Sequence, residues 1–253
     1  MRMKAMIFAA GLGTRLKPLT DRMPKALVPL AGKPLLQWQV EKLRDAGITD
    51  IIVNVHHFPD MIIDTIRANQ GWNCNIAVSD EREMLLDTGG GLKKAFRLLM
   101  DNGQWTMDNG PILACNVDIL SNIDLRALIS AYERSGVSQL VVSKRETQRY
   151  LCFDEKDRLC GWTNIKTGEV RPNNGTWTKE NTQLLAFSGM QILRPDVLAM
   201  LDTMKEDKFS LIDFYLSICG KAELKAFVPN DYRMMDVGKI DQIEEAEIFA
   251  ESL

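Results

Sequence analysis

The residues that most constrain the fold lie at the start of the chain, where an apolar run stops at a glycine-rich turn. Residues 5–10 are continuously apolar and predict a buried strand, which Gly11-Leu12-Gly13-Thr14-Arg15 and then Pro24-Lys25 follow. Glycines let a backbone approach phosphate oxygens closely, and successive N–H groups can form an anion-binding nest. An arginine can fork two phosphate oxygens, and a lysine supplies a point charge. The stretch therefore predicts a loop that wraps a polyphosphate.

The two common phosphate-binding motifs do not describe this loop. It contains no glycine-lysine pair, which the P-loop pattern requires, and Leu16 stands where the dinucleotide-binding pattern G-x-G-x-x-G requires glycine. The alternative is a plain strand-to-loop turn with two surface cations. The combination of Thr14, Arg15 and Pro24-Lys25 favours phosphate binding over that alternative.

This stretch resembles the sugar-1-phosphate nucleotidyltransferases, in which G-x-G-x-R is followed by P-K. The resemblance covers essentially the whole chain. It implies transfer of a nucleotidyl group from a nucleoside triphosphate to a sugar 1-phosphate, with release of pyrophosphate. It also implies a GT-A-like α/β fold, with a Rossmann-like mixed, mostly parallel sheet, helices on both faces and an acceptor-binding lobe.

Composition excludes several other classes of protein. The formal net charge of −3 over 253 residues argues against a nucleic-acid partner, which normally requires a basic excess. The five cysteines form no C-x-x-C pair and the two histidines are adjacent, which disfavours a structural zinc site. No signal peptide and no apolar stretch of membrane-spanning length is evident. We therefore expect a cytoplasmic protein without a membrane partner, either a monomer or a small homo-oligomer.

Hydrophobic periodicity predicts alternating strands and helices, which indicates an open parallel sheet covered on both faces. In residues 1–144, the expected nucleotide-binding part, further strands are predicted at 50–55, 75–79, 111–116 and 139–143. Helices are predicted at 34–46, 58–68 and 125–135, and a glycine loop over residues 85–91 is predicted to open into another helix that runs through Leu99. In residues 145–253, the expected sugar-binding lobe and closing helix, the predictions are a hairpin (150–154 and 158–162), a polar loop (165–182), strands (185–193, 223–227 and 232–237) and helices (195–204, 210–219 and 240–253). We expect a single domain over residues 1–253.

Two aspartates are candidate metal ligands. Asp118 comes just after the predicted strand 111–116, where open α/β sheets bind ligands, and Asp236 precedes Val237-Gly238 at another strand end. Each could instead cap a turn. The resemblance implies that the two hold Mg²⁺, although Val117 and Lys239 replace the glycine and threonine usual in the family. Mg²⁺ between phosphates needs only one or two protein carboxylates.

The segment Leu86-Asp87-Thr88-Gly89-Gly90-Gly91 is similar to the base-recognition loop of the family. Its small residues allow backbone groups to pair with a base edge, and Gly89 and Gly90 are the expected contacts. A helix N-terminus with a flexible entry is the alternative. The form of this segment is closer to the N-acetylmuramate-1-phosphate uridylyltransferases than to the thymidylyltransferases.

The acceptor side is less distinctive. Ser188-Gly189 is similar to the element of the family whose backbone approaches the sugar, and a glycine bulge within a strand is the alternative. Many members carry a lysine for the sugar phosphate after the hairpin. Lys166 lies in the corresponding region, but a plain exposed lysine is the preferred interpretation. The muramate-type enzymes also lack that lysine. His56 and His57 are expected to be structural.

The resemblance thus assigns each candidate residue a role. Arg15, Lys25 and Asp118 are expected to be catalytic, and Asp118 and Asp236 are expected to hold the metal. Ser188 and Gly189 are expected to bind the sugar. The residues expected to bind the nucleotide are Ala10, Gly11, Gly13, Thr14, Arg15, Lys25, Thr88, Gly89 and Gly90. UTP with an N-acetylmuramate or related amino-sugar 1-phosphate is the preferred substrate pair. GTP with mannose 1-phosphate, and dTTP or UTP with glucose 1-phosphate, are alternatives. A non-catalytic nucleotide-binding regulator is an alternative of another class.

Overall fold

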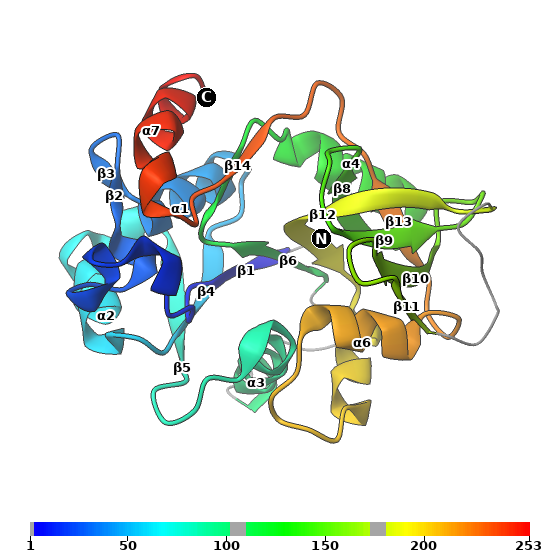
Figure 1. The fold of residues 1–253 in the computed structure, drawn as a ribbon. Helices are drawn as coiled ribbons and strands as arrows, with labels where there is room; N and C mark the ends of the chain where they lie inside the picture. Colours follow the sequence, from blue (N-terminus) through cyan, green and yellow to red (C-terminus); the bar gives the residue numbers. More distant parts are fainter. Residues whose placement is uncertain (1–2, 102–109, 173–180) are drawn as a thin grey trace.

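The computed structural model describes residues 3–101, 110–172 and 181–253, and its centre is a large mixed sheet (Figure 1). The first half of the chain supplies four parallel strands, in the spatial order β5 (Asn75–Asp80), β4 (Asp50–Val55), β1 (Lys4–Phe8) and β6 (Ile112–Asn116). Their parallel order matches the buried, continuously apolar character of residues 5–10 and 50–55.

The second half of the chain extends the sheet with both strand directions. The long strand β12 (Gln183–Leu193) runs antiparallel to β6 and pairs on its other side with β8 (Ser138–Ser143), which β13 (Leu224–Phe227) joins in parallel. The first residues of β12 pair with an antiparallel extension formed by β9 (Arg149–Phe153), β10 (Leu159–Asn164) and β11 (Glu169–Arg171). The predicted mixed, mostly parallel fold is confirmed.

Helices cover both faces of the sheet because successive strand residues point to opposite sides. In β1, Ala5 and Ile7 belong to one hydrophobic cluster, and Met6 and Phe8 belong to the other. The first cluster includes residues of α1 (Leu35–Asp45), α2 (Pro59–Ala68), α4 (Leu125–Ser135) and α7 (Ile243–Glu251). The second includes residues of α3 (Asp87–Asp101), α5 (Pro195–Ala199) and α6 (Leu211–Ile218). Figure 1 shows α3 and α6 together on the face opposite α1.

The carboxyl ends of the parallel strands define one edge of the sheet, where open α/β sheets bind ligands. A small ribbon lies next to this edge and joins distant parts of the chain. In it β7 (Ile119–Ser121), which follows β6 closely, pairs antiparallel with β14 (Met234–Asp236). The C-terminal segment therefore returns to the first half of the chain, and α7 packs there through Ala246 and Ala250.

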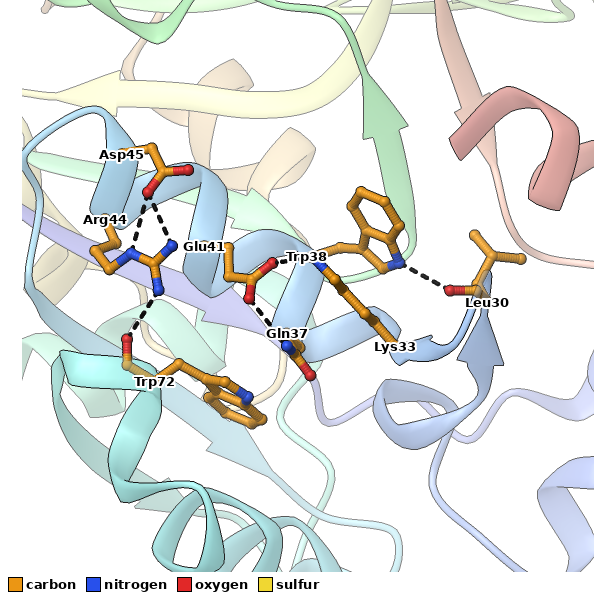
Figure 2. Close-up of polar contacts among 8 residues, drawn as sticks. All are labelled: Leu30, Lys33, Gln37, Trp38, Glu41, Arg44, Asp45 and Trp72. Carbon is orange, nitrogen blue, oxygen red and sulfur yellow. Dashed lines mark hydrogen bonds and ion pairs between the residues drawn. The ribbon is translucent and has the colours of Figure 1, made fainter. Parts of the chain in front are cut away.

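Helix α1 supports this ribbon and is anchored on its outer side (Figure 2). The Trp38 indole N–H donates to the carbonyl of Leu30, in the hairpin of β2 (Pro29–Leu30) and β3 (Lys33–Pro34), at 3.0 Å. Further contacts on that side involve Lys33, Gln37 and Glu41, and Arg44 with Asp45 and the carbonyl of Trp72. On the other side of the helix, Gln39 Nε2 donates to the carbonyl of Ile119 at 2.7 Å, and Lys42 donates to Ser121.

Several predicted boundaries differ from the structure. The glycines at 89–91 lie inside the first turns of α3, which begins at Asp87, rather than in a loop before it. The predicted loop 165–182 contains β11, and its residues 173–180 lie outside the described part of the chain. The predicted helix 195–204 is α5 followed by a 3₁₀ turn, Met200–Thr203. None of the helices formed by the described residues is long and apolar enough to cross a bilayer.

Candidate active site

A cleft of about 420 Å³ opens at the carboxyl edge of the parallel strands. Its walls come from the ends of β1 and β6, the glycine loop after β1, the start of α3 and the turn after β14. The lining residues include Ala9, Gly11, Gly13, Thr14, Arg15, Lys25, Thr88, Asn116, Asp118 and Gly238. An adjoining part of the cleft is lined by Ala10, Asn54, Asp87, Thr88 and Lys208, among others. The structure thus brings most of the predicted nucleotide-binding residues together.

The two glycines of the first loop differ in what surrounds them. Gly13 has a left-handed backbone, with φ of 65°, and a methyl group on it would lie 2.7 Å from Cγ2 of Thr20. Thr20 Oγ1 donates to the carbonyl of Gly13 at 2.8 Å, and His57 Nε2 donates to the carbonyl of Thr20 at 3.0 Å. A methyl group on Gly11 would meet no atom within 4 Å. Gly13 therefore shapes the loop, whereas Gly11 keeps the cleft open.

Two cations of the loop region are paired with the two predicted metal ligands. The Lys25 ammonium forms an ion pair with Asp118, and both side chains are largely buried. Arg15 Nη2 lies 3.9 Å from Oδ2 of Asp236, and both side chains are about half exposed. The residues that were predicted to be catalytic and metal-binding from separate motifs therefore form one charged cluster.

Backbone pairing explains why the two aspartates meet. Asp118 immediately precedes β7 and Asp236 ends β14, and Asp236 is the register partner of Ile119. The N–H of Val237 donates to the carbonyl of Asp118 at 2.8 Å. A methyl group on Gly238 would lie 2.7 Å from Oδ1 of Asp236 and 2.8 Å from Nη2 of Arg15, so Gly238 lies directly against this ion pair.

The electrostatics of the cluster suit a divalent cation. Burial, and after it the charge of Asp118, raises the pKa of the Asp236 carboxyl, whereas nearby cations oppose this rise: Lys25, Arg15 and Arg145. Within residues 3–101, 110–172 and 181–253, no three or more His, Cys, Asp or Glu side chains gather as a metal site. Mg²⁺ between phosphates needs only one or two protein carboxylates and takes its other ligands from phosphates and water, so the chemistry of Asp118 and Asp236 fits this ion.

Gly89 and Gly90, the predicted base contacts, lie in the first turn of α3 and pack against residues 207–209. Their N–H groups donate to the carbonyl of Phe209, at 2.9 and 3.1 Å. A methyl group on Gly89 would lie 2.4 Å from the Phe209 ring, and one on Gly90 would lie 2.0 Å from the carbonyl oxygen of Asp207. The glycines thus allow close packing of the segment 207–209, and of the predicted loop it is Thr88 that lines the cleft. Pairing of Gly89 or Gly90 with a base stays a prediction.

Ser188 and Gly189 lie in β12 at an irregular point of its pairing with β8, between Phe187 and Gln191. Ser188 is buried, and Gly189 has a φ of 68°. A methyl group on Gly189 would lie 2.8 Å from Nδ2 of Asn116, which lines the cleft. The two residues therefore border the cleft side of the sheet, and their contact with a sugar stays a prediction.

The whole chain resembles known enzymes. The family described as nucleotidyl transferase matches residues 4–252. The chain belongs to this family. The N-acetylmuramate alpha-1-phosphate uridylyltransferase of Caulobacter vibrioides is 33% identical over 237 residues, which are 89% of this chain and 88% of that protein. The mannose-1-phosphate guanyltransferase of Aspergillus fumigatus is 29% identical over 244 residues, which are 94% of this chain but 61% of that protein. The predicted resemblance to the sugar-1-phosphate nucleotidyltransferases is confirmed.

Solved structures share the fold of this nucleotidyltransferase. HddC from Yersinia pseudotuberculosis, complexed with GMP-PN, has a TM-score of 0.72 and 24% identity over 99% of this chain and 100% of that chain. A UDP-glucose pyrophosphorylase complexed with UDP-glucose has a TM-score of 0.75 and 18% identity over 100% and 99% of the two chains. At these identities the likeness shows the fold.

Sequence reasoning missed several residues around the cleft of this nucleotidyltransferase. Asn54, in β4, is one of the residues that line the cleft. Glu81 carries a carboxylate that is only 1% exposed. Arg145 follows β8, and its Nη2 donates to the carbonyl of Phe187 at 3.0 Å. Lys208 lines the cleft beside Thr88. A polar residue inside an apolar strand was the available signal for Asn54, whereas the other positions depend on tertiary packing.

Proposed function

We propose that this chain transfers a uridylyl group from UTP to N-acetylmuramate 1-phosphate or a related amino-sugar 1-phosphate, with Mg²⁺ as cofactor. The observation that carries the reaction is the cluster in which Lys25 meets Asp118 and Arg15 meets Asp236 beside the glycine loop. The choice of substrates is supported by the Caulobacter vibrioides relative, which matches this chain over nearly its whole length. The five free cysteines suit a reducing, cytoplasmic setting.

The donor side of the reaction follows from the residues of the loop. The backbone from Gly11 to Thr14 and the guanidinium of Arg15 bind the β- and γ-phosphates. Lys25 lies deeper in the cleft and stabilises the charge that develops on the α-phosphate. The acceptor is already an anion and needs no general base, so alignment and charge neutralisation supply the catalysis. An oxygen of the sugar phosphate forms a bond to the α-phosphorus, and the bond from that phosphorus to pyrophosphate breaks.

Asp118 and Asp236 would hold the Mg²⁺ ion. When bound there, the ion supplies neutralisation of phosphate charge, which is worth several kcal/mol in such roles. The ribbon of β7 and β14 brings the two residues together in the fold. Lys25 and Arg15, which form ion pairs with these carboxylates, lie beside the glycine loop, where they can also bind phosphate oxygens.

Arg145 is the cation best placed for the acceptor phosphate. Since β6 and β8 both run antiparallel to β12, they are parallel to each other, and their carboxyl ends share the edge that holds Asp118. Arg145 follows β8 at that edge and contacts the carbonyl of Phe187, next to the predicted sugar element. Lys166 lies exposed in the turn between β10 and β11 and does not line the cleft. The oligomeric state proposed is a monomer or a small homo-oligomer.

GTP with mannose 1-phosphate is the second candidate pair. It is favoured by the Aspergillus fumigatus guanyltransferase, which matches 94% of this chain. A pair of dTTP or UTP with glucose 1-phosphate uses the same donor residues. A non-catalytic regulator is disfavoured, because a site without catalysis would not need to keep all four charged residues: Arg15, Lys25, Asp118 and Asp236.

A pyrophosphate-release screen tests this function. UTP, GTP, dTTP and ATP are each combined with a panel of sugar 1-phosphates in the presence of Mg²⁺, with reactions lacking the acceptor as controls. We expect release only when both substrates are present, and fastest release from UTP with N-acetylmuramate 1-phosphate. Fastest release from GTP with mannose 1-phosphate would establish the second pair. Absence of release from every pair would contradict the proposed activity.

A further inference from the structure

A buried chain of hydrogen bonds connects the two segments that bound the nucleotide cleft. The N–H of Ala9 donates to Oδ1 of Asn54 at 2.7 Å, and Nδ2 of Asn54 donates to Oε1 of Glu81 at 2.7 Å. The other carboxylate oxygen, Oε2, accepts from the N–H of Leu86 at 3.3 Å. Asn54 is 2% exposed and Glu81 is 1% exposed.

The chain of hydrogen bonds begins and ends in parts of the protein that meet the cleft. Ala9 lines the phosphate side of the cleft, directly before the glycine loop. The carbonyl of Leu86 accepts from the N–H of Phe209 at 3.2 Å, and the carbonyl of Phe209 receives the N–H groups of Gly89 and Gly90. Asn54 and Glu81 therefore connect the phosphate loop to the segment that opens α3.

The surroundings of Glu81 are built around its side chain. Its N–H donates to the carbonyl of Val55 at 2.7 Å, and its carbonyl accepts from His56 Nδ1 at 2.7 Å. A methyl group on Gly91 would lie 2.8 Å from both Oε1 of Glu81 and Nδ2 of Asn54, so this glycine makes room for the pair. The third glycine of the run thus serves the hydrogen-bond chain.

A buried carboxylate at this position costs stability, because burial disfavours the charged form. Burial is the largest effect on Glu81 and raises its pKa, while the hydrogen bonds from Asn54 and Leu86 oppose the rise. Glu81 takes part in no ion pair among the described residues. Its two neighbours both present donors, and an ionised carboxylate accepts from both without presenting a donor of its own.

We propose that Asn54 and Glu81 are positioning residues for the donor nucleotide. Through Ala9 on one side and Leu86 on the other, they hold the phosphate loop and the start of α3 at the separation that one nucleoside triphosphate spans. This inference rests on the proposed function. Neither side chain needs to touch the reacting atoms.

The numbers of hydrogen-bond donors and acceptors at positions 54 and 81 allow a specific test. In Glu81→Gln the amide offers one oxygen and one NH₂ group, so it must direct a donor at either Asn54 or Leu86. In Asn54→Asp two carboxylates face each other. In the double variant Asn54→Asp/Glu81→Gln, the new carboxylate at position 54 accepts from Ala9 and from the new amide at position 81, whose oxygen accepts from Leu86. All three hydrogen bonds are restored with one of them reversed.

The binding of UTP, GTP and inorganic tripolyphosphate is measured by calorimetry with Mg²⁺ and no acceptor, and thermal unfolding checks each variant. Tripolyphosphate engages only the phosphate loop, whereas an intact nucleotide also needs the start of α3 in place. For Glu81→Gln we expect at least about tenfold weaker binding of the tighter-binding nucleotide, but less than about a threefold change for tripolyphosphate. We expect the double variant to recover most of the nucleotide affinity.

Three results would overturn the inference: unchanged nucleotide binding by Glu81→Gln, equal weakening of nucleotide and tripolyphosphate, or a folded double variant that recovers nothing. Failure of the wild-type protein to bind either nucleotide would overturn both this inference and the proposed function. A protein that binds nucleotide and follows the expected pattern but transfers nothing would contradict the proposed function alone.

Discussion

Asp118 and Asp236 come from opposite halves of the chain, and the hydrogen bond of 2.8 Å from the N–H of Val237 to the carbonyl of Asp118 joins the two segments that carry them. The two carboxylates lie close enough for the charge of Asp118 to raise the pKa of Asp236. Like charges held together in a partly buried place favour a cation between them. This relationship gives the metal proposal its physical basis.

Neutralising either aspartate should therefore remove the activity without unfolding the protein. For Asp118→Asn and for Asp236→Asn we expect pyrophosphate release to fall at least about 100-fold, because the charge that holds the metal is lost. Asp241→Asn, a change in the 3₁₀ turn after the site, is the matched control. The measurement is initial rate against Mg²⁺ concentration. Near-full activity of either variant at limiting Mg²⁺ would refute the metal assignment.

Lys25 should matter more for turnover than for folding. Its ammonium pairs with Asp118 at the base of the cleft, where only 9% of the Lys25 side chain is exposed. For Lys25→Ala we expect kcat to fall by about 100-fold, since charge stabilisation in a partly dry site is lost. Thermal unfolding of the variant, measured beside its kcat, shows whether the fold persists. Unchanged turnover would remove Lys25 from the mechanism.

The two glycines of the loop should respond differently to alanine. A methyl group on Gly11 meets no protein atom, so Gly11→Ala should keep its stability but raise the KM for the nucleoside triphosphate about tenfold by filling the cleft. Gly13→Ala forces a left-handed alanine against Thr20 and should lower the free energy of unfolding by about 1–3 kcal/mol. Denaturant unfolding and KM together test this. A loss of stability in Gly11→Ala together with a raised KM in a stable Gly13→Ala would contradict these two roles.

Arg145 and Lys166 offer a matched pair for the acceptor side. For Arg145→Met we expect the KM for the sugar 1-phosphate to rise at least about tenfold, with little change in the KM for the nucleotide, because a charge-assisted contact to phosphate is lost. Lys166→Met should behave like the wild-type protein. Steady-state kinetics with each substrate varied separately is the measurement. If Lys166→Met shows the acceptor defect and Arg145→Met does not, the acceptor phosphate lies elsewhere.

Lys42 predicts a pH dependence of stability. Burial lowers the pKa of its ammonium from 10.5 to about 8, and the Lys42 ammonium donates to Ser121 in the ribbon of β7 and β14. Between these values the unfolded chain binds more protons than the folded one, so this group makes stability rise with pH. Its charged form thus costs on the order of 3 kcal/mol at pH 7. Relative to Lys42→Met, the wild-type free energy of unfolding should increase between pH 7 and pH 9.5. A difference in free energy of unfolding between the two proteins that stays constant with pH would contradict the lowered pKa of Lys42.

Local sequence was enough to predict the strands of the central parallel sheet and the glycine loop after the first of them, because each depends on neighbours in the chain. Arg15 and Lys25 were recognisable from their spacing after an apolar strand. The meeting of Asp118 with Asp236 could be expected only from the resemblance, since the pairing of β7 with β14 joins distant segments.

Other features could not be predicted because they depend on partners that are remote in sequence. Gly89 packs against Phe209, a contact that no local pattern predicts, whereas its pairing with a base stays a prediction. From local sequence, Glu81 would be taken for an ordinary surface residue, and only the folded chain shows its hydrogen bonds with Asn54 and Leu86. Arg145 lies at the same edge of the sheet as Asp118 only because β12 lies antiparallel between β6 and β8.

The central claim is tested most directly by ³¹P NMR of a reaction that contains UTP, N-acetylmuramate 1-phosphate and Mg²⁺, with the same mixture lacking the protein as the control. The account predicts equal amounts of pyrophosphate and of a nucleotide sugar with two linked phosphorus resonances, formed only when both substrates are present. Pyrophosphate or nucleoside monophosphate formed without the acceptor, or no product from any pair in the substrate panel, would contradict it.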